Sequence, residues 1–288
     1  MAAAAQVCCG ASDQFVECGI GQKGAVIEAR RTIDFLNIPV DVLDTHGLFE
    51  RIVALARSGK PNKVTYLNAH CTVLACRDAG YRDFLNRADL VYADGQSVVW
   101  AARLLGGNLP CRSTGADFLA DFCRGFAGQG LRVYLFGAAP GRAEKAAGKL
   151  REAAPGLEIV GVRNGYFEPH ENEALVADIV EARPDILIVG MGVPLQEEWI
   201  DRNLDRLNVP VVWGVGALFD FVAGDLARGP KFLVDNGFEW LCRLCVEPKR
   251  LWKRFLIGNL KFIFYVLAYK FSRKKAGGKA DGASRESE

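Results

Sequence analysis

The chain has 288 residues, of which 50% are hydrophobic and 24% charged, with 31 glycines and 11 prolines. This composition can form one large core or two small ones, and it excludes a wholly disordered chain. We find no run of about 18 uncharged apolar residues, so we expect no ordinary transmembrane helix. Positions 1–24 lack a basic segment leading into a hydrophobic one, so we expect no secretory signal. Nine cysteines, an odd number, in apolar stretches around Cys71, Cys76 and Cys123 are typical of buried thiols in a reducing compartment, so we predict a cytoplasmic protein.

The positive charge is concentrated near the C-terminus. Residues 243–275 carry ten Lys or Arg against one acid, Glu247, which leaves a net charge of −7 on the rest of the chain. Large apolar and aromatic side chains such as Trp252 and Phe264 lie between these cations. This mixture suits an anionic membrane surface. A solvated basic tail and an RNA-binding face are the alternatives; the acidic remainder argues against nucleic acid, because no second basic stripe could follow its backbone.

In chain order we expect a poorly ordered leader (1–30), an α/β domain (31–236), a basic and aromatic helical appendage (237–275) and a disordered tail (276–288). The predicted strands are Thr32–Val40, Lys63–Asn68, Leu90–Ala93, Arg132–Gly137, Leu157–Val162, Asp185–Gly190 and Pro210–Gly216. The predicted helices are Leu48–Ala56, Ala69–Arg77, Ser97–Leu105, Asp117–Phe126, Arg142–Ala153, Glu173–Ala182 and Glu197–Leu207. Apolar strands alternating with amphipathic helices predict a mainly parallel sheet with helices on both faces.

Small and polar residues follow the predicted strands. In open parallel sheets, ligands bind beyond the carboxyl ends of the strands. Those positions hold Asn68, Asp94, the segment 137–141, the segment 190–197 and the segment 214–220. Backbone N–H groups beside helix starts can bind an anionic ligand there. A sugar nucleotide or a dinucleotide would fit.

Several standard chemistries have no motif in the sequence. Gly190-x-Gly192 and Gly214-x-Gly216 lack the third glycine of a dinucleotide fingerprint, and no phosphate-binding loop motif occurs. Cys242 and Cys245 stand alone and cannot fill a tetrahedral zinc site, so we expect them to pack in the interior. No Asp-x-Asp pair occurs, and we predict no metal or other cofactor. A transferase without that pair would neutralise a departing diphosphate with Arg, Lys or backbone dipoles.

A series of short motifs, in a characteristic order and spacing, carries a family resemblance. They are Tyr66–His70, Ala88–Gly95, Arg112–Asp117, Gly165–Phe167, Gly190–Glu197, Gly214–Asp220, Phe238–Leu244 and Glu247–Trp252. From roughly Thr32 to Tyr269 the chain resembles the WecG/TagA/CpsF family of bacterial glycosyltransferases.

The resemblance implies a Rossmann-like (GT-E-like) α/β domain with a C-terminal helical appendage that assists membrane docking and completes the active site. It implies an inverting, metal-independent transfer of a sugar from a UDP-sugar to a polyprenyl-diphosphate-linked saccharide. The product would serve exopolysaccharide, capsule or a related envelope polymer. The enzyme would be peripheral at the inner face of the cytoplasmic membrane.

The resemblance also assigns roles to residues. The general base of the family falls on Asp94, which would take the proton of the acceptor hydroxyl as it attacks the anomeric carbon; an Asp that caps the next helix is the alternative. Asn68 and Gln196 match polar positions of the pocket, where amides bond sugar hydroxyls or the base of UDP. Arg112 matches an arginine suited to a diphosphate. The alternatives are a strand-end turn for Asn68 and solvent-exposed roles for Gln196 and Arg112.

In the appendage, Arg243, Arg250 and one of Lys253 or Arg254 match basic positions that close over the diphosphate of donor or acceptor. Contact with solvent or lipid headgroups is the alternative, and Pro248 is expected to interrupt the helix between them. Gly137 and Gly141 are expected to form a turn that faces the diphosphate. Asp220 could hold a ribose or cap a helix.

Two residues depart from the family pattern. Tyr66 stands where teichoic-acid members carry a small hydroxyl residue, although the hydroxyl of Thr65 is adjacent, and Leu195 replaces a commonly basic residue. The donor sugar therefore cannot be carried over from one family member, N-acetylmannosamine included. An oxidoreductase with a nucleotide cofactor and a non-catalytic membrane-bound scaffold that binds a nucleotide sugar remain as alternatives. Self-association is open.

Overall fold

The computed structural model describes residues 30–224, 229–230, 232–233 and 237–283. Its centre is a six-stranded sheet whose strands are all parallel. In spatial order the strands are β4 (Leu90–Ala93), β3 (Asn62–Leu67), β8 (Val211–Gly214), β7 (Ile186–Gly190), β5 (Arg132–Gly137) and β6 (Glu158–Arg163). The predicted Rossmann-like α/β class is confirmed, and these six strands lie within two residues of the predicted ends.

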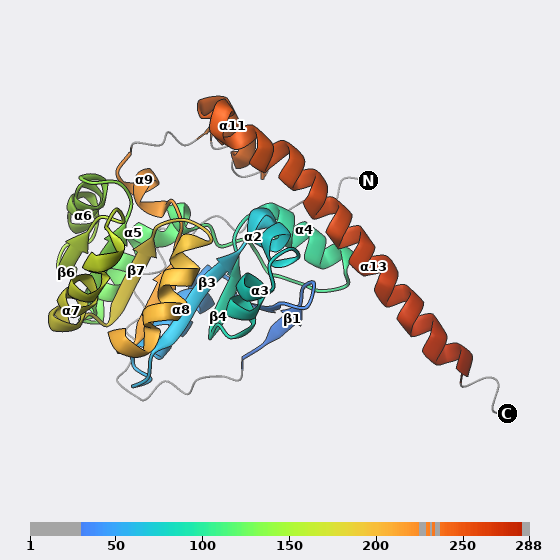
Figure 1. Cartoon of the computed structure of the whole chain (residues 1–288), viewed down its shortest axis with the longest axis horizontal. Coiled ribbons are helices and arrows are strands. Elements are labelled where there is room, and N and C mark those ends of the chain that lie inside the picture. The colour runs from blue at the N-terminus through green and yellow to red at the C-terminus, as the bar shows by residue number, and fades with distance from the viewer. Residues whose placement is uncertain (1–29, 225–228, 231, 234–236, 284–288) are drawn as a thin grey trace.

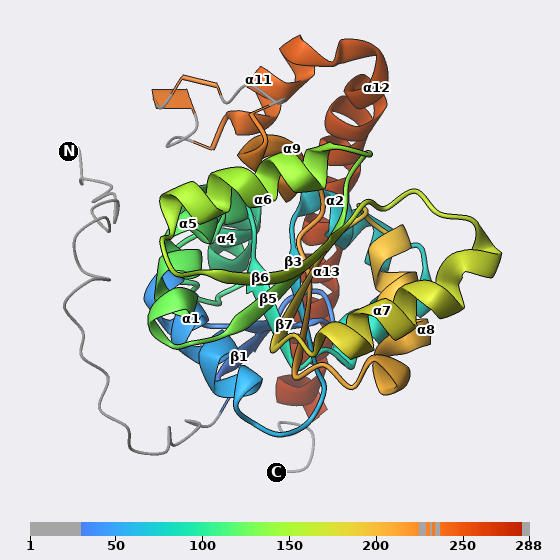
Figure 2. The same cartoon turned by 90° about the vertical axis from the view of Figure 1, so that its left-hand side faces the viewer.

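Helices cover both faces of the sheet (Figure 2). On one face lie α1 (Thr45–Ala56), α4 (Gln96–Leu104), α5 (Gly115–Gly128), α6 (Arg142–Ala153) and α9 (Leu218–Val222). On the other lie α2 (Ala69–Ala75), α3 (Ala79–Asn86), α7 (Asn172–Ala182) and α8 (Leu195–Leu207), with the short η1 (Pro169–Glu171) leading into α7. Since both faces are covered, the strands are buried and almost continuously apolar.

The N-terminal strand segment and helix α3 differ from the sequence expectation. The predicted strand Thr32–Val40 is wrong: the segment forms a hairpin of β1 (Thr32–Asp34) and β2 (Pro39–Asp41). Leu36 and Asn37 adopt positive φ angles of 53° and 62° in its two-residue turn, a backbone that favours the right-handed twist of a hairpin. Helix α3 was not expected. It begins where the Asp78 carboxylate accepts a hydrogen bond from the Tyr81 N–H at 3.0 Å.

The appendage is a chain of helices that crosses one side of the domain (Figure 1). It consists of α11 (Glu239–Val246), α12 (Pro248–Trp252), the π-helical turn η2 (Lys253–Ile257) and α13 (Gly258–Ala283). The break between α11 and α12 falls at Pro248, as expected, and α13 continues beyond residue 275.

Helix α13 is fixed to the domain along one stripe. Phe262 and Val266 are buried, and the ring of Phe262 stacks on Phe35 of the β1–β2 turn at 6.5 Å between centroids. Two turns beyond Phe262, the Tyr269 hydroxyl donates a hydrogen bond to the Asp34 carboxylate. Helix α13 also packs along α2. The β1–β2 hairpin and α13 are therefore packed against each other through a ring contact and a hydrogen bond.

The opposite side of this helix is exposed and apolar. Leu260, Phe264 and Phe271, spaced by four and seven residues on one helical face, are 69%, 66% and 62% exposed. The segment Lys253–Arg273 is, by length and composition alone, long and apolar enough to cross a membrane. Lys261 and Lys270 interrupt the run of uncharged apolar residues, as the sequence analysis found, yet the segment as a whole is apolar enough to pass, so the expectation of no ordinary transmembrane helix stays a prediction.

Gly137 illustrates how closely the strands approach one another near the site. It ends β5 with φ 141°, and a Cβ at this position would lie 2.4 Å from the carbonyl carbon and oxygen of Gly190 on β7. Gly141, at φ 80°, has open space around the corresponding position. The first glycine is thus required by packing and conformation, and the second by conformation alone.

We predict that Gly137→Ala lowers the free energy of unfolding by about 3 kcal/mol or more, because strain and overlap with the Gly190 backbone add together. Gly141→Ala is the matched control and should cost about 1 kcal/mol, the penalty of a left-handed residue. Urea denaturation followed by circular dichroism measures both. Equal losses would contradict the packing role of Gly137.

Candidate active site

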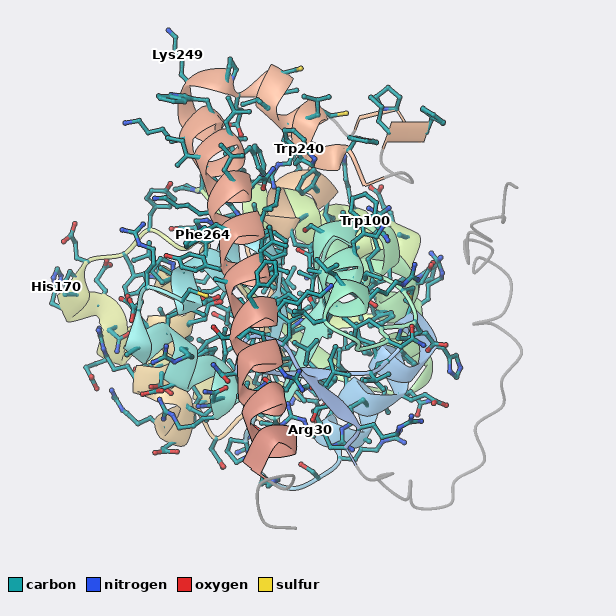
Figure 3. The ribbon with its side chains drawn as sticks, turned by 90° about the vertical axis from the view of Figure 1, so that its right-hand side faces the viewer. Arg30, Trp100, His170, Trp240, Lys249 and Phe264 are labelled. Atoms are coloured by element: carbon teal, nitrogen blue, oxygen red, sulfur yellow. The ribbon has the colours of Figure 1, made fainter. Side chains whose placement is uncertain are left out.

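A cavity of about 1460 Å³ lies beyond the carboxyl ends of β3, β4, β5, β7 and β8. The α/β domain forms its floor, and α11, η2 and α13 contribute one wall. Figure 3 shows this wall from outside, with α13 in front of the domain and Trp240 of α11 above Trp100 of α4. The volume exceeds the several hundred Å³ typical of a single small-ligand site, so two substrates have room to meet.

Asp94 lies on the floor of this cavity, directly after β4. Its backbone N–H donates to the carbonyl oxygen of Leu67 at the end of β3, 2.9 Å away. The following helix α4 starts at Gln96 with Gly95 as its N-cap, and no side chain caps it. Asp94 is therefore not the N-cap of α4, the role that the sequence left open as an alternative.

Asn68 connects the cap of the neighbouring helix to this carboxylate. Its side-chain oxygen accepts a hydrogen bond from the Cys71 N–H at 3.0 Å and so caps α2. Its amide nitrogen donates to Asp94 Oδ2 at 3.3 Å. Because the cap fixes the orientation of the amide, the N–H side must point toward Asp94. Asn68 thus orients the carboxylate, and it also lines the cavity.

Three arginines from different parts of the chain line the same cavity. Arg112 precedes α5, Arg243 lies on α11 and Arg254 lies on η2. The guanidinium of Arg243 stacks over the Phe221 ring at 5.0 Å. Lys253, by contrast, is exposed and lies over its neighbour Trp252, so of the pair considered from sequence Arg254 is the cavity residue. The side chain of Arg250 lies outside the described part of the structure.

Gln196 is fully buried below the cavity and does not line it. Its side-chain oxygen accepts from the Gly216 N–H at 2.8 Å, and its amide nitrogen donates to Glu197 Oε1 at 2.6 Å. Gln196 therefore ties the start of α8 to the loop after β8. Thr65 is also fully buried, on β3 beside Glu197, and does not line the cavity.

The remaining predicted residues lie at the other end of the cavity. Gly137 and Gly141 bracket the loop after β5, but Ala138, Ala139 and Arg142, not the glycines, line the cavity there. Asp220 lines it too and forms an ion pair with Arg142 at 2.8 Å. Asp220 is not the N-cap of α9, which is Ala217.

Two cavity residues were not singled out from sequence. His70 lies in the first turn of α2; burial, and then the positive charge of Arg254, lower its pKa to about 4, so its imidazole is neutral near pH 7. Tyr166 follows β6 and exposes 74% of its surface at the cavity edge. Both residues lie within the family motifs. The sequence alone, however, does not show whether the side chain of a single His or Tyr points into a cavity.

None of the cysteines that the structure describes lines this cavity. Cys71, behind the floor, is fully buried, and this burial raises its pKa to about 12. Cys242 is half-buried and Cys245 is exposed, so the expected interior packing of this pair is wrong. Within the described ranges, no three His, Cys, Asp or Glu side chains group together as metal ligands.

The protonation state of Glu197, a buried residue next to Gln196, can be tested through the stability of the protein. Burial raises its pKa to about 8 against an ordinary value near 4.5, which leaves the carboxyl neutral near pH 7. Since the folded state holds the proton more tightly, its contribution to stability is complete below pH 4.5 and is lost as the pH rises toward 8. We predict that Glu197→Gln removes this decline, so the variant gains stability relative to wild type between pH 5 and pH 8.

Urea denaturation at pH 5, 6.5 and 8 measures this difference in unfolding free energy. Glu198→Gln, the same change at an exposed neighbour, is the control and should keep most of the wild-type decline. A wild-type stability that does not fall over this range, or a parallel fall in Glu197→Gln, would contradict a buried neutral carboxyl.

Comparison with known proteins agrees with the resemblance described from the motifs. The chain is 28% identical over 236 residues to an N-acetylglucosaminyldiphosphoundecaprenol N-acetyl-beta-D-mannosaminyltransferase of Bacillus subtilis, covering 82% of this chain and 87% of that protein. It is 31% identical over 202 residues to the protein of the same name from Bacillus spizizenii, covering 70% of this chain and 77% of that protein. The family model described as "Glycosyl transferase WecG/TagA/CpsF family" matches residues 33–276, so the chain belongs to this family of glycosyltransferases.

Proposed function

We propose that the protein is an inverting glycosyltransferase that moves a sugar from a UDP-sugar to a polyprenyl-diphosphate-linked saccharide. The observation that carries the proposal is a carboxylate, Asp94, held by Asn68 on the floor of a cavity that Arg112, Arg243 and Arg254 also line. Such a set can remove a proton from the acceptor hydroxyl and stabilise the negative charge of the donor and acceptor diphosphates. Both relatives are named as transferases that act on N-acetylglucosaminyldiphosphoundecaprenol, a sugar linked through a diphosphate to a polyprenol.

Inversion requires a single displacement at the anomeric carbon. Asp94 takes the proton of the acceptor hydroxyl, and the oxygen attacks the anomeric carbon from the face opposite UDP as the bond to the diphosphate breaks. Asn68 keeps the carboxylate oriented through its 3.3 Å hydrogen bond. The departing diphosphate needs positive charge, which arginines can supply through paired N–H donors. In this mechanism no metal ion is required.

The nucleotide is expected at the end of the cavity beyond β5, β6 and β7. The loop 137–141, the Arg142–Asp220 pair and the exposed ring of Tyr166 meet there. An aromatic face can stack on a base, and a carboxylate can accept hydrogen bonds from a ribose. This end lies at the strand ends, where nucleotides bind in open parallel sheets.

The donor sugar is left to experiment, because the two residues that depart from the family pattern both lie at the cavity. Tyr66 lines it with its hydroxyl facing Gly216, and Leu195 is 59% exposed at its edge. A bulky phenol in place of a small hydroxyl changes the space beside the general base. The donor of the Bacillus proteins therefore need not be the donor here.

The first test is transfer itself. We expect a panel of UDP-sugars with a short polyprenyl-diphosphate-linked N-acetylglucosamine acceptor to give one product by mass spectrometry, with EDTA leaving the rate unchanged. Asp94→Asn should lower kcat by about 100-fold or more, because the general base is lost. Asp89→Asn is the control. Asp89 directly precedes β4, its carboxylate accepts a hydrogen bond from the Lys63 N–H of β3, and it does not line the cavity.

Both variants should bind UDP and unfold as wild type does. Full-rate transfer by Asp94→Asn would overturn the base assignment, and loss of activity in EDTA would overturn the metal-independent mechanism. Binding of UDP with no transfer from any donor would instead favour a nucleotide-sugar-binding scaffold.

We further propose that the appendage places the enzyme on the inner face of the cytoplasmic membrane. The exposed stripe of Leu260, Phe264 and Phe271 would enter the headgroup region, flanked by the basic residues of segment 243–275. The same apolar length could instead cross a bilayer. A peripheral arrangement agrees with the buried stripe of Phe262 and Val266, which already packs on the domain.

Vesicle sedimentation tests this arrangement. Phe264→Ser and Phe271→Ser together should weaken binding to vesicles containing anionic lipid by about 30-fold, since about 2 kcal/mol is lost when large apolar side chains no longer insert. High salt should weaken wild-type binding, because surface cations are screened beyond about 10 Å at 0.1 M. Val180→Ser, an exposed apolar residue on α7, is the control. Binding that resists both salt and carbonate extraction would indicate a spanning helix instead.

A further inference from the structure

The cavity has an apolar end that the chemistry described above does not use. Trp100 and Leu104 lie one turn apart on α4 and line it from the domain side. Ile263 and Leu267 lie one turn apart on α13 and line it from the appendage side. Figure 3 shows Trp100 beside the α13 ribbon. Large apolar side chains from two helices thus line the same cavity.

All four side chains remain substantially exposed. The exposed fractions are 51% for Trp100 and 44% for Leu104, with 53% for Ile263 and 39% for Leu267. Exposed apolar surface gathered at one place, next to a polar site, is typical of a surface that binds an apolar ligand. Phe262 and Val266 on the same helix are buried, so α13 can still hold its place while the neighbouring stripe stays open.

The residues that line the cavity change in character from a carboxylate, through an arginine, to apolar side chains. The reacting carboxylate of Asp94 lies on the floor, Arg254 lies on the wall at the start of the appendage helix, and Ile263 and Leu267 follow on that same helix. Within the described residues, the buried Nε of Arg254 has no hydrogen-bond partner. A molecule with a hydroxyl, then a diphosphate, then a hydrocarbon chain matches this order.

We propose that the apolar end between α4 and α13 binds the first isoprene units of the polyprenyl chain of the acceptor. This inference rests on the proposed function, since it assigns a place to one part of the proposed acceptor. The chain would leave the cavity past Ile263 and Leu267 and reach the exposed stripe of Leu260, Phe264 and Phe271 on the same helix. It would therefore pass from the cavity to the bilayer along apolar surface.

The test compares acceptors that share one diphosphate-linked sugar and differ in tail length. One carries a polyprenyl chain of several isoprene units, and the other a tail of two carbons. Both are assayed with the full chain in a fixed concentration of neutral detergent, which removes vesicle binding from the measurement. We expect wild type to show a lower KM for the long tail.

Leu104→Ser and Ile263→Ser should each raise the KM of the long-tail acceptor about tenfold, because a single apolar contact in such a pocket is worth tenfold or more in discrimination. Their kcat, and their KM for the short-tail acceptor and for the donor, should stay as in wild type. Val180→Ser on α7 is the matched control. A KM change that is equal for both tails, or no preference of wild type for tail length, would overturn the proposal.

Photocrosslinking gives a second measurement that does not depend on folded variants. A prenyl diphosphate with a photoreactive group on its first isoprene units should label peptides of α4 and the cavity side of α13. Labelling confined to other helices, or displaced equally by a plain detergent alkyl chain, would overturn the proposal. If no donor and no acceptor of either tail length support transfer, the proposed function fails, whereas the labelling result still decides whether the prenyl site exists.

Discussion

The parallel pairing of β3 with β4 is the constraint on which the site depends. It places Leu67 opposite Ala93, so that the next residues, Asn68 and Asp94, leave the sheet side by side. The backbone bond from Asp94 to Leu67 continues this ladder for one more residue. Asn68 must then turn its amide toward Asp94, because its oxygen is occupied by the cap of α2. Two adjacent strand ends thus define the position of the proposed base without any contribution from a long loop.

The walls above this floor come from more distant segments. Arg112 follows α4, whereas Arg243 and Arg254 belong to helices that cross the domain from outside. Their positions depend on how α13 packs, through Phe262 on Phe35 and along α2. The two parts of the chain therefore contribute different features to the cavity. The ends of the sheet strands fix the position of Asp94, and the appendage adds positive charge and apolar surface. One continuous helical segment carries both, since Arg254 lies on η2 and Ile263 lies on α13, which follows it directly.

How far the sequence predicts this structure depends on how local each feature is. Strand ends such as Ala93 follow from apolar runs, so Asp94 and Asn68 could be placed correctly at the edge of the sheet. The choice between Lys253 and Arg254 could not, because adjacent helical residues point about 100° apart and only the packing of the helix decides which faces the cavity. The packing of α8 likewise decides that the side chain of Gln196 points into the protein interior and not into the cavity. The break in Thr32–Val40 was hidden because Leu36, a residue with no turn preference, adopts a positive φ.

The contact between the N-terminal hairpin and α13 has a consequence for how the protein matures. Tyr269 and Asp34 are 235 positions apart in the chain, yet they hold the wall of the cavity in place. During synthesis the floor residues Asn68 and Asp94 leave the ribosome long before Arg243 and Arg254 do. A nascent chain therefore has the proposed base before it has the two arginines that line the wall above it. The cavity is therefore complete only after the C-terminal helices have been synthesised.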